Sequence, residues 1–197
     1  MCGFAGASWN DPQHAIDATT LEAMTRVLTH RGPDQSGSWF DPRVALGHRR
    51  LSIIDLDSGR QPLGNEDGSV QVVFNGEIYN YRELRDELQG RGHVFATQSD
   101  TEVIVHLYEE HGDECLDQLR GMFALAIWDT KRQRLLLARD RLGQKPLIYR
   151  EEPGRLLFAS ELKALLQVPN APRQLAPKRR APQYVHNISR TWESTTA

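Results

Sequence analysis

The chain opens with Met1-Cys2-Gly3-Phe4-Ala5-Gly6, and this stretch carries the residue around which the fold is organised. Removal of Met1, which the small side chain after it permits, would make Cys2 the N-terminal residue. Cys2 would then carry both a thiol and an α-amine, whose pKa of about 7.7–8.0 leaves a useful fraction neutral near pH 7. A neutral amine can take the proton of an attacking thiol, as covalent catalysis by a nucleophile requires. The alternative is that Cys2 is simply the residue after Met1.

Composition and charge predict one globular domain that binds neither nucleic acid nor a membrane. The chain has 197 residues and a net charge of -2, so no polyanionic partner is implied. Its two cysteines, Cys2 and Cys115, are too few for a disulfide framework and lack metal-type spacing, so neither a metal nor a cofactor is expected. Cys115 is interpreted as an inert core thiol. With no membrane-length apolar run and no signal-peptide pattern, we expect a cytoplasmic protein.

Residue periodicity predicts a domain of mixed strands and helices. Apolar runs predict strands at residues 3–8, 38–40, 44–54, 70–74, 93–98, 122–128, 135–138, 147–149 and 156–159. Helical spacing predicts helices that begin at Thr20, after Asn80 and after Ser99, a short one near Cys115, and a last one at residues 161–166 capped by Ser160. Several strands are continuously apolar, which implies burial on both faces under helices or a second sheet.

The dipeptide Asn75-Gly76 directly follows the apolar run at residues 70–74. Asn-Gly after a strand is a strong hairpin signal. Here, however, a helix N-terminus at Asn80, with Glu83 at its third position, follows too soon for a second strand. We therefore expect a strand end that leads into a helix and leaves the polar groups of Asn75-Gly76 facing a pocket.

Ser99-Asp100-Thr101-Glu102 has the spacing of a capping box, with Ser99 as the cap and Glu102 reaching back to it. In that setting Asp100 can be an ordinary acid favoured by the helix dipole, or it can be a ligand for a positively charged group.

Apolar periodicity stops after Val168. Residues 169–197 contain four prolines and the cluster Lys178-Arg179-Arg180, which is interpreted as a solvated run of charge. Such a segment has little apolar surface to bury. We therefore expect a domain at residues 2–168 and a poorly packed tail at residues 169–197.

Five motifs occur together in a fixed order: the N-terminal cysteine, His30-Arg31-Gly32-Pro33-Asp34, Arg50 before Leu51-Ser52-Ile53, Asn75-Gly76-Glu77-Ile78-Tyr79-Asn80, and Ser99-Asp100-Thr101-Glu102. Their combination resembles the glutaminase domain (class II glutamine amidotransferase domain) of glutamine-hydrolysing asparagine synthetases, over roughly residues 1–166. The resemblance implies an α+β fold, namely a four-layer αββα N-terminal-nucleophile hydrolase sandwich of two antiparallel sheets.

The resemblance also implies a catalytic role for three residues. Cys2 would attack the side-chain amide of glutamine, form a thioester and release ammonia, with its own amine as the proton shuttle. The Asn75 side chain and the Gly76 backbone N–H would stabilise the oxyanion of the tetrahedral intermediate.

Three further residues would bind the substrate. Arg50 would hold the α-carboxylate of glutamine with a planar, bidentate guanidinium, and Glu77 and Asp100 would hold its α-ammonium group. The family usually has an acidic residue before the matching arginine, whereas this chain has Arg49. Neighbouring residues of a strand point to opposite faces, so one of the two arginines can face the substrate, and the match favours Arg50.

The chain shows no Ser-Gly-Gly phosphate loop of the kind found in the ATP-dependent synthetase domain. We therefore expect the glutaminase half alone, which hydrolyses L-glutamine to glutamate and ammonia for a synthetase domain or subunit in trans; a homodimer is left open. The other explanation is that the reading frame was cut or shifted near Pro177, which would leave an unrelated tail. One alternative is a non-catalytic remnant or a glutamine-binding regulatory module, in which Met1 would be retained. Another is an amidotransferase subunit that serves a different ammonia acceptor, such as a sugar or phosphoribosyl pyrophosphate.

Overall fold

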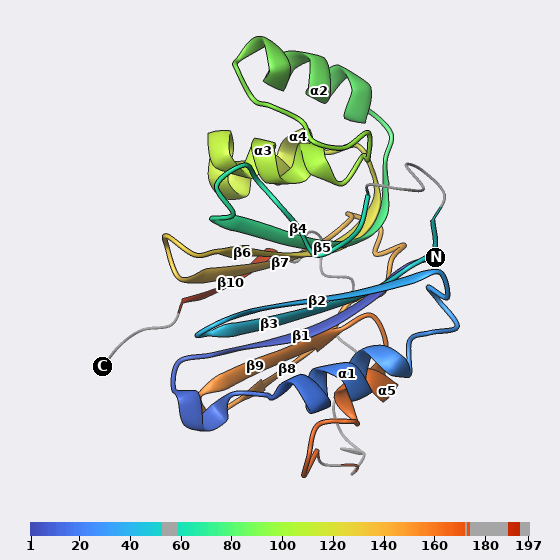
Figure 1. Ribbon diagram of the computed structural model, residues 1–197, viewed down its shortest axis with the longest axis vertical. Coiled ribbons are helices and arrows are strands. Elements are labelled where there is room, and N and C mark those ends of the chain that lie inside the picture. Colours follow the sequence, from blue (N-terminus) through green and yellow to red (C-terminus); the bar gives the residue numbers. More distant parts are fainter. Residues whose placement is uncertain (53–58, 172, 174–188, 194–197) are drawn as a thin grey trace.

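The computed structural model describes residues 1–52, 59–171, 173 and 189–193. Over these residues, two five-stranded antiparallel sheets lie face to face (Figure 1). The first sheet has the order β2-β3-β1-β9-β8 and consists of β1 (Gly3–Trp9), β2 (Gln35–Asp41), β3 (Val44–Arg50), β8 (Ile148–Glu152) and β9 (Arg155–Ala159). The second has the order β10-β7-β6-β5-β4 and consists of β4 (Leu63–Gly64), β5 (Val70–Ile78), β6 (Gly121–Asp129), β7 (Arg134–Arg139) and β10 (Ser189–Glu193).

Helices cover the outer faces of both sheets. The helices are α1 (Ala18–Arg26), α2 (Tyr81–Gly90), α3 (Glu102–His111), α4 (Cys115–Gln118) and α5 (Leu162–Leu165), with 3-10 turns at Pro12–His14 and Gly112–Glu114. Figure 1 shows α1 and α5 beside the first sheet, and α2, α3 and α4 beside the second. The expected four-layer αββα sandwich of two antiparallel sheets is therefore confirmed, as is the expected burial of the apolar strands on both faces.

Three apolar layers hold the sandwich together, because each strand sends alternate side chains to opposite faces. In β6, Ala124, Ala126 and Trp128 pack between the two sheets. The residues between them, Leu125 and Ile127, pack under the helices of the second sheet. In β1, likewise, Phe4 faces the other sheet and Ala5 faces α1.

This alternation decides which polar residues reach the space between the sheets. In β3, Val44 and Leu46 belong to the inter-sheet core, so His48 and Arg50 have the same orientation. In β5, Val73 belongs to that core, which orients Asn75 in the same direction. Polar groups from both sheets therefore meet at one end of the inter-sheet core.

Three helix starts differ from the sequence predictions. Helix α1 begins at Ala18 and not at Thr20, because Asp17 is its cap and accepts the N–H of Thr20. Helix α3 begins at Glu102. Ser99 Oγ accepts the N–H of Thr101 at 3.1 Å, but the Ser99 N–H donates to Thr97 Oγ1 and not to Glu102, so the Glu102 half of the expected capping box is wrong. The Glu102 carboxylate instead accepts backbone N–H bonds from Ala96 and Thr97, both at 2.7 Å. Ser160 does not cap α5, because its hydroxyl accepts the N–H of Phe4 at 3.0 Å and ties the end of β9 to β1.

The strand expected at residues 93–98 is also wrong, because this segment has no strand pairing. Side chains fix its course in place of a sheet. Arg85 of α2 donates to the carbonyls of Thr97 and Ser99 at 2.8 and 3.1 Å, and its guanidinium lies 4.4 Å from the centre of the Phe95 ring. The strand expected at residues 44–54 ends at Arg50, and its part at residues 53–54 lies outside the described residues.

One part of the expected tail pairs with the domain. Strand β10 extends the second sheet, with Ser189 opposite Ala138 and Glu193 opposite Arg134 of β7. An edge strand is held by backbone hydrogen bonds, which need no apolar periodicity, so the composition of the tail did not reveal it. Residue 172 and residues 174–188 lie outside the described part.

Among the described residues, no helix has the length and apolar character needed to cross a membrane.

Candidate active site

The six residues singled out from the sequence line one small cavity of about 70 Å³. They come from the segment before β1, the end of β3, the end of β5 and the loop before α3: Cys2, Arg50, Asn75, Gly76, Glu77 and Asp100. The other lining residues are Met1, Leu51, Gly59, Gln61, Phe74, Ser99, Thr101 and Lys145. Met1 and Cys2 line the cavity, so it lies where the chain begins. Figure 1 marks this N-terminal end with N, at one end of the sandwich.

Cys2 directly precedes β1, the central strand of the first sheet. Its Sγ accepts the backbone N–H of Leu51 at 3.4 Å, and its carbonyl oxygen accepts a bond from Arg31 Nε at 2.9 Å. Arg31 is oriented in turn by an ion pair with Glu161 at 2.9 Å. Burial raises the pKa of the Cys2 thiol, although the bond from Leu51 opposes this effect. The thiol therefore needs a base before it can act as a nucleophile.

Asn75 and Gly76 both line the cavity, and Asn75 brings a side-chain amide there. Asn75 is 1% exposed, and its Nδ2 has no hydrogen-bond partner among the described residues. An unpaired buried donor costs about 1–3 kcal/mol, so its presence points to an acceptor that enters the cavity. A Cβ atom at Gly76 would lie 2.2 Å from the carbonyl oxygen of Met122 on β6, so this position accepts no side chain.

The two arginines of β3 face different surroundings. Arg50 is 5% exposed, lines the cavity and donates to Gln35 Oε1 at 3.0 Å. Arg49 points to the other face of the strand, where its Nε donates to the carbonyl of Gly32 at 3.1 Å. Strand alternation thus brings Arg50, and not Arg49, to the cavity.

Asp100 and Glu77 place carboxylates at the cavity. Asp100 is buried, and its Oδ2 accepts the N–H of Ile78 at 2.9 Å. Burial raises the pKa of Asp100 to about 6; the Ile78 bond opposes this rise and the neighbouring charge of Glu77 adds to it. Two carboxylates at the wall of a partly closed cavity form a natural site for a cation such as an ammonium group.

Comparisons with known proteins show the family to which this chain belongs. The family model described as "Glutamine amidotransferase domain" matches residues 1–195. The chain belongs to this family. Asparagine synthetase [glutamine-hydrolyzing] 3 of Bacillus subtilis (strain 168) is 45% identical over 174 residues, which are 86% of this chain and 28% of the relative. Asparagine synthetase B [glutamine-hydrolyzing] of Escherichia coli (strain K12) is 47% identical over 146 residues, 74% of this chain and 26% of the relative. The amidotransferase chain thus spans about a quarter of the length of these relatives.

Two solved structures share the fold of this amidotransferase domain. Glutamine phosphoribosylpyrophosphate amidotransferase from B. subtilis, complexed with ADP and GMP, has a TM-score of 0.67 at 24% identity and covers 85% of this chain and 43% of its own. The structure titled "allosteric regulatory enzyme of purine biosynthesis" has a TM-score of 0.68 at 20% identity and covers 100% of this chain and 50% of its own.

Two buried residues that belong to none of the five sequence motifs also position the site of this amidotransferase domain. Gln61 accepts the N–H of Phe74 through Oε1 at 2.6 Å and donates to Thr101 Oγ1 at 3.3 Å, so it links β5 to the loop of Asp100. His48 contacts the Phe74 carbonyl through Nε2 at 3.0 Å, and burial lowers its pKa to about 4, which keeps the ring neutral. A polar residue within an apolar strand was the signal for His48, whereas Gln61 had none.

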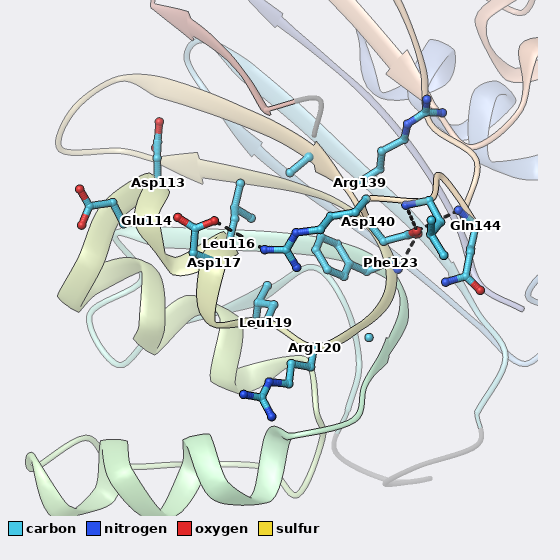
Figure 2. A pocket seen from close by; sticks show the side chains of 14 residues that line it. Asp113, Glu114, Leu116, Asp117, Leu119, Arg120, Phe123, Arg139, Asp140 and Gln144 are labelled. Carbon is cyan, nitrogen blue, oxygen red and sulfur yellow. Dashed lines mark hydrogen bonds and ion pairs between the residues drawn. The ribbon is translucent and has the colours of Figure 1, made fainter. Parts of the chain in front are cut away.

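A larger cavity of about 570 Å³ lies between α4 and the loop after β7 (Figure 2). None of the six predicted site residues lines it. Asp140, at its wall, accepts backbone N–H bonds from four residues and so shapes the loop: Phe123, Leu142, Gln144 and Lys145. The loop brings Lys145 to the smaller cavity, where its Nζ lies 3.3 Å from Met1 Sδ. The larger cavity therefore borders the loop that supports the site but holds none of its predicted catalytic groups.

Proposed function

We propose that this amidotransferase domain hydrolyses L-glutamine to glutamate and ammonia through a thioester on Cys2. The observation that carries the proposal is the unpaired, buried Nδ2 of Asn75 in the cavity that Cys2 also lines. A thiol beside an unused donor suits a reaction in which negative charge develops on a carbonyl oxygen.

The first step would form a bond between Cys2 Sγ and the amide carbon of glutamine. The thiol proton would pass to the α-amine of Cys2, freed by removal of Met1, and then to the departing ammonia. This transfer is needed because burial raises the pKa of the thiol. An α-amine with a pKa of about 7.7–8.0 is a suitable base near neutral pH. Water would then release glutamate from the thioester.

Substrate binding would use the charges on the cavity wall. Arg50 would hold the α-carboxylate and Asp100 with Glu77 the α-ammonium, which together fix the end of glutamine that does not react. These interactions would be formed both before and during the reaction, so they are expected to set KM more than kcat.

The ammonia acceptor is proposed from the relatives. Two relatives named as glutamine-hydrolysing asparagine synthetases are 45% and 47% identical to this chain. We propose that the ammonia is used for an asparagine synthetase-type reaction in a synthetase unit. The test of the function is an assay for glutamate and ammonia from glutamine, combined with an intact-mass measurement. Equimolar products from protein that lacks Met1 support the proposal; trimmed protein that binds glutamine without turnover contradicts it.

Replacing Arg50 with lysine should raise KM for glutamine by about 10- to 100-fold, because lysine cannot grip a carboxylate with two parallel bonds. Arg49→Lys is the matched control on the opposite face of β3 and should change KM less than about threefold. Steady-state kinetics of both variants check this prediction. If Arg49→Lys raises KM as much as Arg50→Lys does, the assignment of the α-carboxylate to Arg50 is wrong.

Asp100→Asn should weaken glutamine binding and stabilise the protein without substrate at pH 7.5. The pKa of Asp100 is raised to about 6, above the usual value of about 3.9 in an unfolded chain. The folded protein therefore keeps the Asp100 proton to a higher pH than the unfolded chain does. The stabilisation that the protonated carboxyl gives the folded state is fully present below pH about 4 and is lost as the pH rises through about 6. Removing the buried charge should raise Tm at pH 7.5 on the order of 5 °C.

The same titration should appear in the kinetics. Wild-type KM for glutamine should rise as the pH falls below about 6, since a protonated Asp100 no longer attracts an ammonium group. Asp100→Asn should have a high KM that lacks this pH dependence. An unchanged KM at pH 7.5, or a lower Tm at that pH, would contradict the assignment.

A further inference from the structure

A second cluster of ionisable side chains lies outside the cavity of Cys2. Glu66, His93, His106 and Glu109 each place one potential ligand atom within 4.8 Å of the other three. We propose that these four side chains form a binding site for one divalent transition-metal ion, and that Zn²⁺ fits it best. The proposal is independent of the glutaminase reaction.

The spacing of the ligand atoms is close to that of a metal's first coordination shell. His106 Nδ1 lies 3.2 Å from Glu109 Oε2 and 3.5 Å from Glu66 Oε2, and His93 Nδ1 lies 3.7 Å from Glu109 Oε2. Ligands held about 2.0–2.2 Å from a tetrahedral zinc ion are about 3.3–3.6 Å apart. Small side-chain rotations would therefore complete the shell.

The two carboxylates are already oriented by their other oxygen atoms. Glu66 Oε1 accepts the backbone N–H of Val94 at 3.0 Å, which leaves Oε2 toward His106. Glu109 Oε1 accepts a bond from Asn65 Nδ2 at 2.7 Å, which leaves Oε2 toward both histidines. Each carboxylate thus offers one oxygen to the cluster while a neutral donor fixes the other.

Both histidines have the arrangement that metal-bound histidines show, with one ring nitrogen toward the ligand cluster and the other toward a carboxylate. His93 Nε2 lies 3.0 Å from Glu110 Oε1. His106 Nε2 lies 3.7 Å from Glu102 Oε1, and it has no hydrogen-bond partner within the described residues. The His106 side chain is 1% exposed, so water does not readily supply that partner. A small movement of the ring toward Glu102 would give Nε2 its partner while Nδ1 stays directed at the ligand cluster.

The donor set selects the type of ion. Two imidazoles and two carboxylates suit zinc, a borderline ion that takes nitrogen and oxygen ligands in a tetrahedron. Magnesium and calcium favour sites made of oxygen alone. The sequence did not reveal this cluster, because His106 and Glu109 lie on one face of α3 while the other two residues come from separate loops.

A metal here would join three segments that are separate in the sequence. Glu66 precedes β5, His93 follows α2, and His106 and Glu109 lie on α3, which covers the second sheet. Binding would replace the protons that the imidazoles otherwise share with the carboxylates, so zinc should release protons and raise Tm.

The test measures Zn²⁺ binding to the full chain by competition with a chromophoric chelator. It uses the Cys2→Ala background, because an N-terminal cysteine can itself chelate zinc through its thiol and amine. We expect one ion per chain, proton release on binding and a Tm that rises with zinc concentration. Co²⁺ should give the visible bands of a tetrahedral site without a thiolate charge-transfer band.

Ligand variants locate the ion. His93→Gln and Glu109→Gln should each weaken Zn²⁺ binding by more than about 100-fold, beyond the 10- to 100-fold that loss of a supporting residue typically costs. His111→Gln, at the end of the same helix, is the matched control and should bind like the background. In Glu109→Gln the side-chain oxygen that accepts from Asn65 Nδ2 is kept. This variant should therefore stay folded, and it tests the site even if His93→Gln unfolds. Absence of a bound ion in the background, or equal affinity in all four proteins, would overturn the proposal and leave a proton-linked ion-pair cluster.

Discussion

Replacing Cys2 with alanine should reduce glutamine hydrolysis to less than a few per cent of the wild-type rate, with little change in Tm. The reaction depends on the thiol as the nucleophile, whereas the small side chain before β1 contributes little to packing. Glutamate release, measured with the intact mass and the melting temperature of the same sample, checks both parts. Residual turnover above this level would show that Cys2 is not the nucleophile.

Two controls sharpen this experiment. Cys115→Ala removes the other thiol, which is fully buried and whose pKa burial raises to about 12, so activity should persist and an electrophilic glutamine analogue should still label the protein once. A variant with one lysine inserted between Met1 and Cys2 keeps the thiol but blocks its α-amine. If that variant remains as active as the wild type, the amine is not the base.

Replacing Asn75 with alanine should lower kcat by about 10²- to 10³-fold, the usual cost of losing one oxyanion donor. The same change should leave Tm unchanged or slightly higher, because the Nδ2 that it removes is buried and has no partner among the described residues. This combination separates a catalytic donor from a structural one, whose removal would lower Tm. Steady-state kinetics and thermal unfolding provide the two measurements.

Asn65→Ala is the matched control for Asn75. Asn65 is also buried, but its side chain donates to Asp67, Ser69 and Glu109 and accepts the N–H of Val70. Its replacement should therefore lower Tm and leave kcat near the wild-type value. A large loss of kcat in Asn65→Ala, or a clear loss of stability in Asn75→Ala, would contradict the role proposed for Asn75.

The sequence by itself indicated the layered fold, through the family that its motifs resemble, and six of the residues that line the cavity. Continuous apolar strands such as β6 can be buried on both faces in a sandwich, and that arrangement is what the structure has. Asn75-Gly76, Arg50 and Asp100 were found because each belongs to a short motif whose order along the chain is specific. Their catalytic and binding roles stay predictions until the variants are measured.

Local signals failed where a side chain bonds to backbone outside its own helix. Glu102 has capping-box spacing, yet it fixes the backbone of Ala96 and Thr97. Ser160 has the place of a cap, yet it bonds to Phe4. Each side chain could accept a backbone N–H at the start of its own helix or a backbone N–H of another segment. The packing of the sheets and loops decides which of the two lies within reach.

The tertiary structure alone decided which residues support the site and which ones gather elsewhere. Gln61 reaches both Phe74 and Thr101, segments 13 and 40 residues away along the chain. The four residues of the proposed metal site come from two loops and α3. Periodicity and motif spacing describe neighbours along the chain, whereas these contacts form because two sheets and their helices bring distant segments within hydrogen-bond reach.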